Sequence, residues 1–181
     1  QMFGAQSGLP AILINIHRIA DPSDAKAYIA RLKGLEAKME GLIAEAERRA
    51  SLGVLPPTFV YDRVLLDAAN VIKGAPFDEG EPSTLFADFS KKIDALDIKD
   101  GKKADLKEKA TKALLDHVKP AYEKLIQAMT AQKAQSSTHD GVWKLRDGAA
   151  YYAERLNFHT TTQMSADQIH ALGLSEVARI H

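Results

Sequence analysis

The strongest constraint on this sequence is a helical repeat of apolar residues. Apolar side chains recur at intervals of three and four residues from Ala25 to Ser51, and again from Ala104 to about Lys133. Residues with this spacing lie on one face of an α-helix, whereas half-buried strands alternate with a period of two. The sequence therefore predicts an all-α protein: a multi-helix array of long antiparallel helices with at most one short strand or hairpin.

Local start and stop signals bound these helices. Asp21 precedes a proline and predicts an N-cap for the first long helix, which Gly53 ends. Pro56–Pro57 opens the next helix, and Gly74 closes it. Pro120 lies within the second long run, where the missing N–H predicts a kink or two helices in sequence.

Shorter elements follow from the same signals. Ser83 predicts the N-cap of a helix that extends through Leu96. Val142–Leu145 is the candidate for an isolated strand, and Asp147 and Ser165 predict the N-caps of two final helices. We expect one helical fragment over residues 1–181, with a scaffold over residues 1–134 and a connector and tail over residues 135–181.

The charge and the lengths of the apolar runs limit the classes of partner that this chain can bind. The 24 basic and 24 acidic residues give a net charge of zero, which argues against nucleic acid as a partner. The longest apolar run, Leu9–Ile16, is much shorter than the roughly 20 residues that cross a bilayer, so no membrane span is expected. The chain starts at Gln1 without a methionine and stops at His181 within a helical pattern. These ends predict a fragment of a longer protein whose exposed apolar surface favours self-association.

The tail carries the side chains most suited to binding. Tyr151, Tyr152, His159, Thr160 and Thr161 place two phenols, an imidazole and two hydroxyls close together in the sequence. On a helix Tyr152 and His159, seven residues apart, share one face and are candidates for binding a substrate. The alternative is structural: the threonines end a helix, the tyrosine fills a core, and the imidazole bonds a carbonyl.

Other polar residues receive structural interpretations. His17 follows an apolar run and is expected at its rim, whereas His117 is expected to be solvated. The mixed charges around Glu45–Arg49 are expected to form a solvated helix face with weak ion pairs. The six histidines lack the spacing of a zinc motif, and phosphate-binding and serine-nucleophile motifs do not occur. We therefore assign no catalytic and no metal-binding residue to this chain.

Short motifs along nearly the whole chain occur in the order found in one bacterial family. They are Gln1–Pro10 with His17, Tyr28-x-x-Arg31-Leu32, Gly53-Val54-x-Pro56-Pro57, Pro120-Ala121-Tyr122, Gly141-Val142-Trp143, Asp147-Gly148 with Tyr151-Tyr152, His159–Thr162 and Ile169–Ile180. By these motifs the chain resembles the central part of the family called domain of unknown function 885.

That resemblance implies a mainly helical, zinc-dependent, peptidase-like hydrolase, with a periplasmic or lipid-anchored place in the cell envelope. The family's His-Glu-x-x-Pro-Gly-His motif lies downstream of the segment that matches Glu176–Ile180, and this sequence stops before it. The resemblance therefore implies zinc in the full-length parent but no cofactor in this chain, which alone should be inactive.

The resemblance also implies two partners for the intact protein. These are a peptide-like substrate and the missing C-terminal half of the same protein. The tail residues from Tyr151 to Thr161 would then form part of a substrate-binding wall. The alternative is a non-enzymatic helical interaction module of unknown function, in which the two long helices present surfaces to a partner.

Overall fold

The structure is a computed structural model that describes residues 4–181, and these residues divide into two compact units, one up to residue 138 and the other over residues 139–181. Regular structure in the described residues is entirely helical, which confirms the all-α prediction. Residues 1–3, which begin the motif Gln1–Pro10, lie outside the described residues. None of the described helices combines the length and the apolar character that a bilayer crossing requires.

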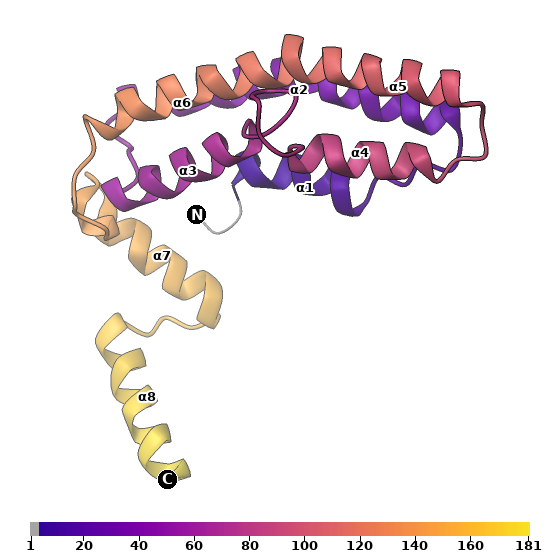
Figure 1. Cartoon of the computed structure of the whole chain (residues 1–181). Coiled ribbons are helices and arrows are strands. Elements are labelled where there is room, and N and C mark those ends of the chain that lie inside the picture. Colours follow the sequence, from indigo (N-terminus) through magenta and orange to yellow (C-terminus); the bar gives the residue numbers. More distant parts are fainter. Residues whose placement is uncertain (1–3) are drawn as a thin grey trace. The chain divides into compact units, whose positions relative to one another are not determined.

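The first unit consists of two layers of helices (Figure 1). One layer pairs the longest helix, α2, with a rod made of α5, a π-helical segment and α6. Beneath it, α3 packs on α6, α4 packs on α5, and α1 contacts both α3 and α4. The bounds are α1 (Ala5–Asn15), α2 (Pro22–Ser51), α3 (Thr58–Val71), α4 (Thr84–Asp94), α5 (Asp100–Ala113), the π-helical segment (Leu114–Val118) and α6 (Lys119–Lys133).

Side-chain pairs fix the directions of these helices. Glu36 on α2 contacts His117 at 2.8 Å, and Glu40, one turn further on, contacts Lys124 at 2.6 Å, so α2 runs parallel to the rod. By contrast, α3 runs antiparallel to α6, because its first residue, Thr58, bonds Ser136 just beyond the end of α6.

The core lies between the two layers of the first unit. Apolar residues at three- and four-residue intervals on α2 face the rod and the lower helices, as the periodicity predicts. Full burial of each large apolar side chain stabilises the fold by about 1.5–3 kcal/mol. The largest fully buried side chains are Tyr28, Leu32, Met39, Tyr61, Phe89, Ile93, Leu106, Leu114, Val118 and Tyr122.

Two predicted boundaries are confirmed at atomic level. Asp21 caps α2, since its Oδ1 accepts hydrogen bonds from the backbone N–H groups of Ser23 at 2.6 Å and Asp24 at 3.0 Å. Pro120 lies at the start of a new helix, directly after the π-helical segment. The wider π turn accommodates the proline, which has no N–H for the preceding turn, so two helices follow one another as one rod.

Other local predictions need correction. Ser83 occupies the N-cap position of α4, but its hydroxyl is buried and finds no hydrogen-bond partner among the described residues. Asp147 likewise precedes α7 without a side-chain capping bond. Val142–Leu145 does not form a strand, because Val142–Lys144 is a 3₁₀ turn. No neighbouring strand offers a ladder there within residues 4–181, and a lone strand leaves its backbone groups unpaired.

The second unit contains that 3₁₀ turn, α7 (Gly148–Thr160) and α8 (Ala166–Ile180). Ser165 caps α8 as predicted, and Gln168 completes a reciprocal capping box. The unit has little interior: of its residues, only Gly148 is buried. A Cβ atom at Gly148 would meet the carbonyl oxygen of Val142 at 2.0 Å, so the turn and α7 pack closely only because this residue is glycine.

Candidate functional site

The tail residues singled out in the sequence lie on α7 and on the turn that follows it. Tyr151 and Tyr152 are 52% and 50% exposed, and His159 is exposed near the C-terminal end of the same helix. The hydroxyls of both tyrosines and the ring nitrogens of His159 form no hydrogen bond within the described part of the chain. The structure therefore places three available hydrogen-bonding groups on one helix.

Tyr152 and His159 share a face of α7, but they are not adjacent. Seven residues in a helix rise by about 10 Å, which is nearly two turns. A spacing of two turns along one face suits contact with one elongated ligand.

Tyr151 points elsewhere around the helix and has an intramolecular partner. The guanidinium carbon of Arg155 lies 5.9 Å from the Tyr151 ring and 4.7 Å from the ring of Phe158. Arg155 also forms an ion pair with Glu154, and this contact lowers the pKa of the Glu154 carboxyl. A planar cation held between aromatic faces fixes the orientation of these side chains.

The threonines after His159 direct their hydroxyls to local partners. Thr160 Oγ1 donates to the backbone oxygen of Leu156 at 2.8 Å, and Thr161 Oγ1 donates to the backbone oxygen of Thr160 at 2.7 Å. Thr161 has a left-handed conformation, with φ of 57°, and ends α7. A β-branched residue seldom adopts this conformation, which normally favours glycine.

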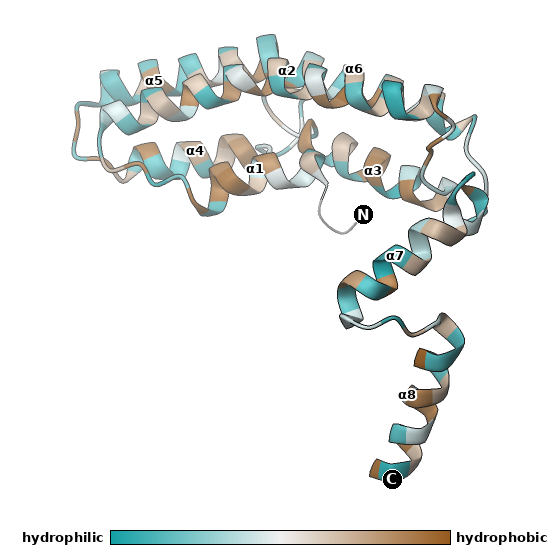
Figure 2. Cartoon of the chain, turned by 180° about the vertical axis from the view of Figure 1, so that it is seen from behind, coloured by the Kyte–Doolittle hydropathy of each residue, from teal (hydrophilic) through white to brown (hydrophobic). Residues whose placement is uncertain are grey.

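α8 presents an uncovered apolar face. Leu172, Val177 and Ile180 are 50%, 56% and 71% exposed, and Ile169 is half-buried. These positions follow the helical period and fall on one side, where Figure 2 shows hydrophobic residues recurring along the helix. An amphipathic helix of this kind normally rests its apolar side on another surface.

Histidines elsewhere have structural partners. His17 is 7% exposed and buried, not at the rim as expected: its Nε2 lies 3.1 Å from the backbone oxygen of Asp24, and its Nδ1 lies 2.5 Å from Arg31. His117 is half-buried and contacts Glu36 at 2.8 Å, so it is not the freely solvated side chain that was expected. No group of three potential metal ligands comes together within residues 4–181.

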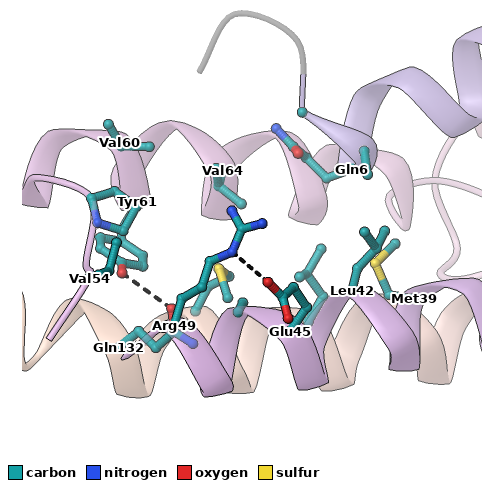
Figure 3. A pocket seen from close by; sticks show the side chains of 16 residues that line it. Gln6, Met39, Leu42, Glu45, Arg49, Val54, Val60, Tyr61, Val64 and Gln132 are labelled. Carbon is teal, nitrogen blue, oxygen red and sulfur yellow. Dashed lines mark hydrogen bonds and ion pairs between the residues drawn. The ribbon is translucent and has the colours of Figure 1, made fainter. Parts of the chain in front are cut away.

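A second candidate site lies in the first unit and escaped the sequence analysis. A cavity of about 280 Å³ opens between α2, α3 and α6 (Figure 3). Its walls are mainly apolar, and four polar side chains complete them. The apolar wall includes Met39, Leu42, Val60, Val64, Leu125 and Met129, and the polar residues are Gln6, Glu45, Arg49 and Gln132.

Gln132 is the most informative residue of this cavity. It is 6% exposed, and its Oε1 accepts a hydrogen bond of 3.2 Å from the Tyr61 hydroxyl. Its Nε2 is buried and has no hydrogen-bond partner among the described residues. A buried donor left without an acceptor costs about 1–3 kcal/mol, so it commonly marks a place where a ligand or a water binds.

Glu45 and Arg49 form the charged side of the cavity. Arg49 Nε donates to Glu45 at 2.7 Å, and Arg48 donates to the same carboxylate at 2.7 Å. The two guanidinium groups lower the pKa of Glu45 to about 2. The prediction of a merely solvated charged face is therefore incomplete, because Glu45 and Arg49 also line a cavity.

The fold defines an all-α protein with a helical core unit and a short C-terminal pair of helices. The chain belongs to the family described as bacterial protein of unknown function (DUF885), whose family model matches residues 1–181. This finding confirms the family resemblance.

Comparison with solved structures gives the same fold. A crystal structure described as that of the putative lipoprotein from Colwellia psychrerythraea matches 98% of this chain with a TM-score of 0.86 and 24% sequence identity. The chain spans only 30% of the length of that protein. Comparison with curated proteins finds no significant match.

Proposed function

We propose that this chain is the scaffold and substrate-contacting part of a larger, peptidase-like hydrolase of the cell envelope. The first unit is the rigid frame, and α7 contacts a peptide-like substrate. The observation that carries the proposal is the pair of exposed, unbonded side chains on one face of α7, Tyr152 and His159. Both are side chains that bind well because an apolar ring carries a polar group.

The spacing of this pair favours an extended ligand. An extended peptide advances about 3.3 Å per residue, so the rise of about 10 Å between Tyr152 and His159 corresponds to roughly three residues of substrate. The Tyr152 hydroxyl donates to one backbone carbonyl of the peptide, and the His159 ring binds a second polar group further along. Tyr151 and Arg155 border this face and contact substrate side chains.

The threonine turn sets the end of the proposed wall. Strained conformations are retained at positions where the geometry matters for function, and Thr161 is the only non-glycine residue with positive φ among those that the structure describes. Its local bonds fix the path of the chain directly after His159. In this proposal, Thr160 and Thr161 hold the shape of the wall and offer their remaining lone pairs to the substrate.

The reactive centre of the proposed hydrolase lies outside this chain. The described residues do not assemble a metal site, and we assign no step of a reaction to them. The resemblance to zinc-dependent peptidases motivates zinc in the complete protein, held by residues beyond those described. The description of the solved relative as a putative lipoprotein supports a lipid-anchored, envelope location, again as a proposal.

Two measurements test this function. The first is binding of a peptide library to the chain, followed by NMR, with Tyr152→Phe, His159→Ala and the control Asn157→Ala. Asn157 lies about 140° around α7 from Tyr152, since each residue turns the helix by about 100°. The second is peptide hydrolysis by the complete product of the reading frame carrying the same substitutions.

The proposal predicts that Tyr152→Phe and His159→Ala each weaken peptide binding and turnover by about tenfold, the loss of one well-placed hydrogen bond. Asn157→Ala should leave both within about twofold of the parent protein. Equal behaviour of all three variants would remove α7 from the substrate site.

A second function has an observation in its favour. The uncovered apolar face of α8 also suits a non-enzymatic interaction module that binds another protein surface. In that case, the complete protein hydrolyses no peptide, and substitutions at Tyr152 and His159 leave partner binding unchanged. The same hydrolysis measurement therefore separates the two functions.

A further inference from the structure

The cavity of the first unit offers a polar group that the fold does not use. Gln132 Nε2 is buried in the cavity wall, while Tyr61 occupies the oxygen of the same amide. The hydrogen bond from Tyr61 holds the amide in place. The unused N–H group lies just beneath the cavity surface, so it can donate to an acceptor that displaces the atoms covering it.

The rest of the wall selects the body of the ligand. Aliphatic and thioether side chains from α2, α3 and α6 surround the hollow in Figure 3. Its volume of about 280 Å³ is close to the lower end of small-molecule pockets, which begin at about 300 Å³. Since one water-sized group takes up about 30 Å³, the cavity holds a chain of roughly ten non-hydrogen atoms.

The charge at the cavity selects the head of the ligand. Arg49 reaches over the hollow in Figure 3 and uses its Nε to bond Glu45. Its terminal nitrogens form no hydrogen bond within the described residues. Glu45 faces two guanidinium groups, from Arg48 and Arg49, so the group of three carries one excess positive charge. A guanidinium fork matches a carboxylate in shape and charge.

We propose that this cavity binds a medium-chain aliphatic monocarboxylate. The tail lies against the apolar wall, and the carboxylate accepts hydrogen bonds from Gln132 Nε2 and from the terminal nitrogens of Arg49. This site is separate from the α7 face, and the inference does not depend on the proposed function.

Sodium octanoate is a suitable probe, since its anion has about ten non-hydrogen atoms, the number that the cavity volume allows. Calorimetric titration of the 181-residue chain with octanoate should show one binding site per chain. Octylammonium has the same tail and the opposite charge, and its binding should be at least about tenfold weaker. Equal binding of the two amphiphiles would overturn the proposal, because a general hydrophobic surface does not discriminate between their heads.

A matched pair of arginine variants tests the head site. Arg49→Met and Arg48→Met remove the same charge from the same carboxylate partner, yet only Arg49 lines the cavity. We expect Arg49→Met to weaken octanoate binding about tenfold and Arg48→Met to change it by no more than about twofold. Gln132→Met should also weaken binding about tenfold. Equal effects of Arg48→Met and Arg49→Met would contradict the site.

A cavity-filling variant tests the tail site. Val64→Phe places a larger side chain in the wall and should abolish octanoate binding while circular dichroism shows the parent helix content. Ala46→Leu, also in the wall, serves in its place if Val64→Phe fails to fold. Unchanged binding in a folded variant would place octanoate elsewhere on the chain and overturn the proposal.

Discussion

The hydroxyl of Tyr122 on α6 donates a 2.6 Å hydrogen bond to the backbone carbonyl of Gln6 on α1. In a regular helix this carbonyl would accept from the N–H four residues later, and that position is Pro10, which has none. The buried phenol therefore replaces a bond that the proline removes from α1. Burial also raises the pKa of Tyr122 well above its usual value, so the hydroxyl remains a donor at all ordinary pH values.

Tyr122→Phe should destabilise the protein by about 1–3 kcal/mol, because it leaves a buried carbonyl without a donor. The cost should be smaller in a Pro10→Ala background, where a backbone N–H becomes available. Urea denaturation of the two single variants and the double variant measures this coupling. A strictly additive double variant would show that Tyr122 does not compensate for Pro10.

Lys92 should contribute more to stability than its neighbour Lys91. Its ammonium group donates to the backbone oxygens of Leu13 at 3.0 Å and Ile14 at 2.9 Å, and it forms an ion pair with Asp88 at 2.8 Å. The carbonyls belong to the last turn of α1, where a cation is favourable. Lys92→Met should cost about 1.5–3 kcal/mol of unfolding free energy.

The matched control for Lys92 lies on the adjacent position of α4. Lys91 is exposed, so Lys91→Met should change the unfolding free energy by less than about 0.5 kcal/mol. If urea denaturation gives similar changes in unfolding free energy for Lys92→Met and Lys91→Met, the contacts of Lys92 with the α1 carbonyls do not stabilise the fold.

Asp78 should give the fold a dependence on acid pH. Its carboxylate accepts hydrogen bonds from the backbone N–H groups of Gly74 at 2.9 Å and Gly80 at 2.7 Å, and these bonds lower its pKa in the folded state. A lowered folded pKa stabilises the protein above the unfolded value of about 3.9, and this contribution is lost as pH falls through the folded pKa.

Asp78→Asn should therefore lower the melting temperature near pH 6, with a difference from the parent that narrows as pH falls below about 4 and through the lowered folded pKa. Thermal melts of both proteins over this range measure the difference, and subtraction removes the titration of other carboxyls such as Glu45. A difference that is constant with pH would show that the Asp78 charge is not responsible.

Gly148→Ala should disturb the second unit. The added Cβ would meet the Val142 carbonyl oxygen at 2.0 Å, and backbone has to move to relieve the contact. We expect faster amide exchange or proteolysis around the start of α7, at a cost of about 1–3 kcal/mol. Gly173→Ala, where the added Cβ meets nothing within 4 Å, is the control and should increase helicity. Protection unchanged by Gly148→Ala would contradict the close packing.

Much of the helical fold could be predicted, because helix formation leaves local signals. The three- and four-residue apolar period located α2 and α6, and Asp21 and Ser165 marked helix starts through capping bonds that the structure contains. α1 was missed as a helix because it contains Pro10 and lacks a clear apolar period. The hydrogen bond that replaces the one lost at Pro10 comes from Tyr122, which is 116 residues away from Gln6 in the sequence.

The two candidate sites differ in how visible they are in the sequence. The α7 residues were found because they lie close together in the chain, although their mutual separation required the helix geometry. The cavity was missed because Arg49, Tyr61 and Gln132 come from three helices far apart in the sequence. Long-range packing brings them together. No local sequence pattern indicates that the side-chain N–H of Gln132 lacks a hydrogen-bond partner.

The proposal that this chain is one part of a larger protein predicts that another surface covers the apolar face of α8, and sedimentation of Val177→Glu tests that prediction most directly. The parent chain should self-associate as its concentration rises, because the apolar face of α8 is exposed. Val177→Glu should sediment as a monomer, whereas Ala178→Glu, about 100° further around the helix, should associate like the parent. A parent chain that remains monomeric at all concentrations, or equal association of both variants, would contradict the claim.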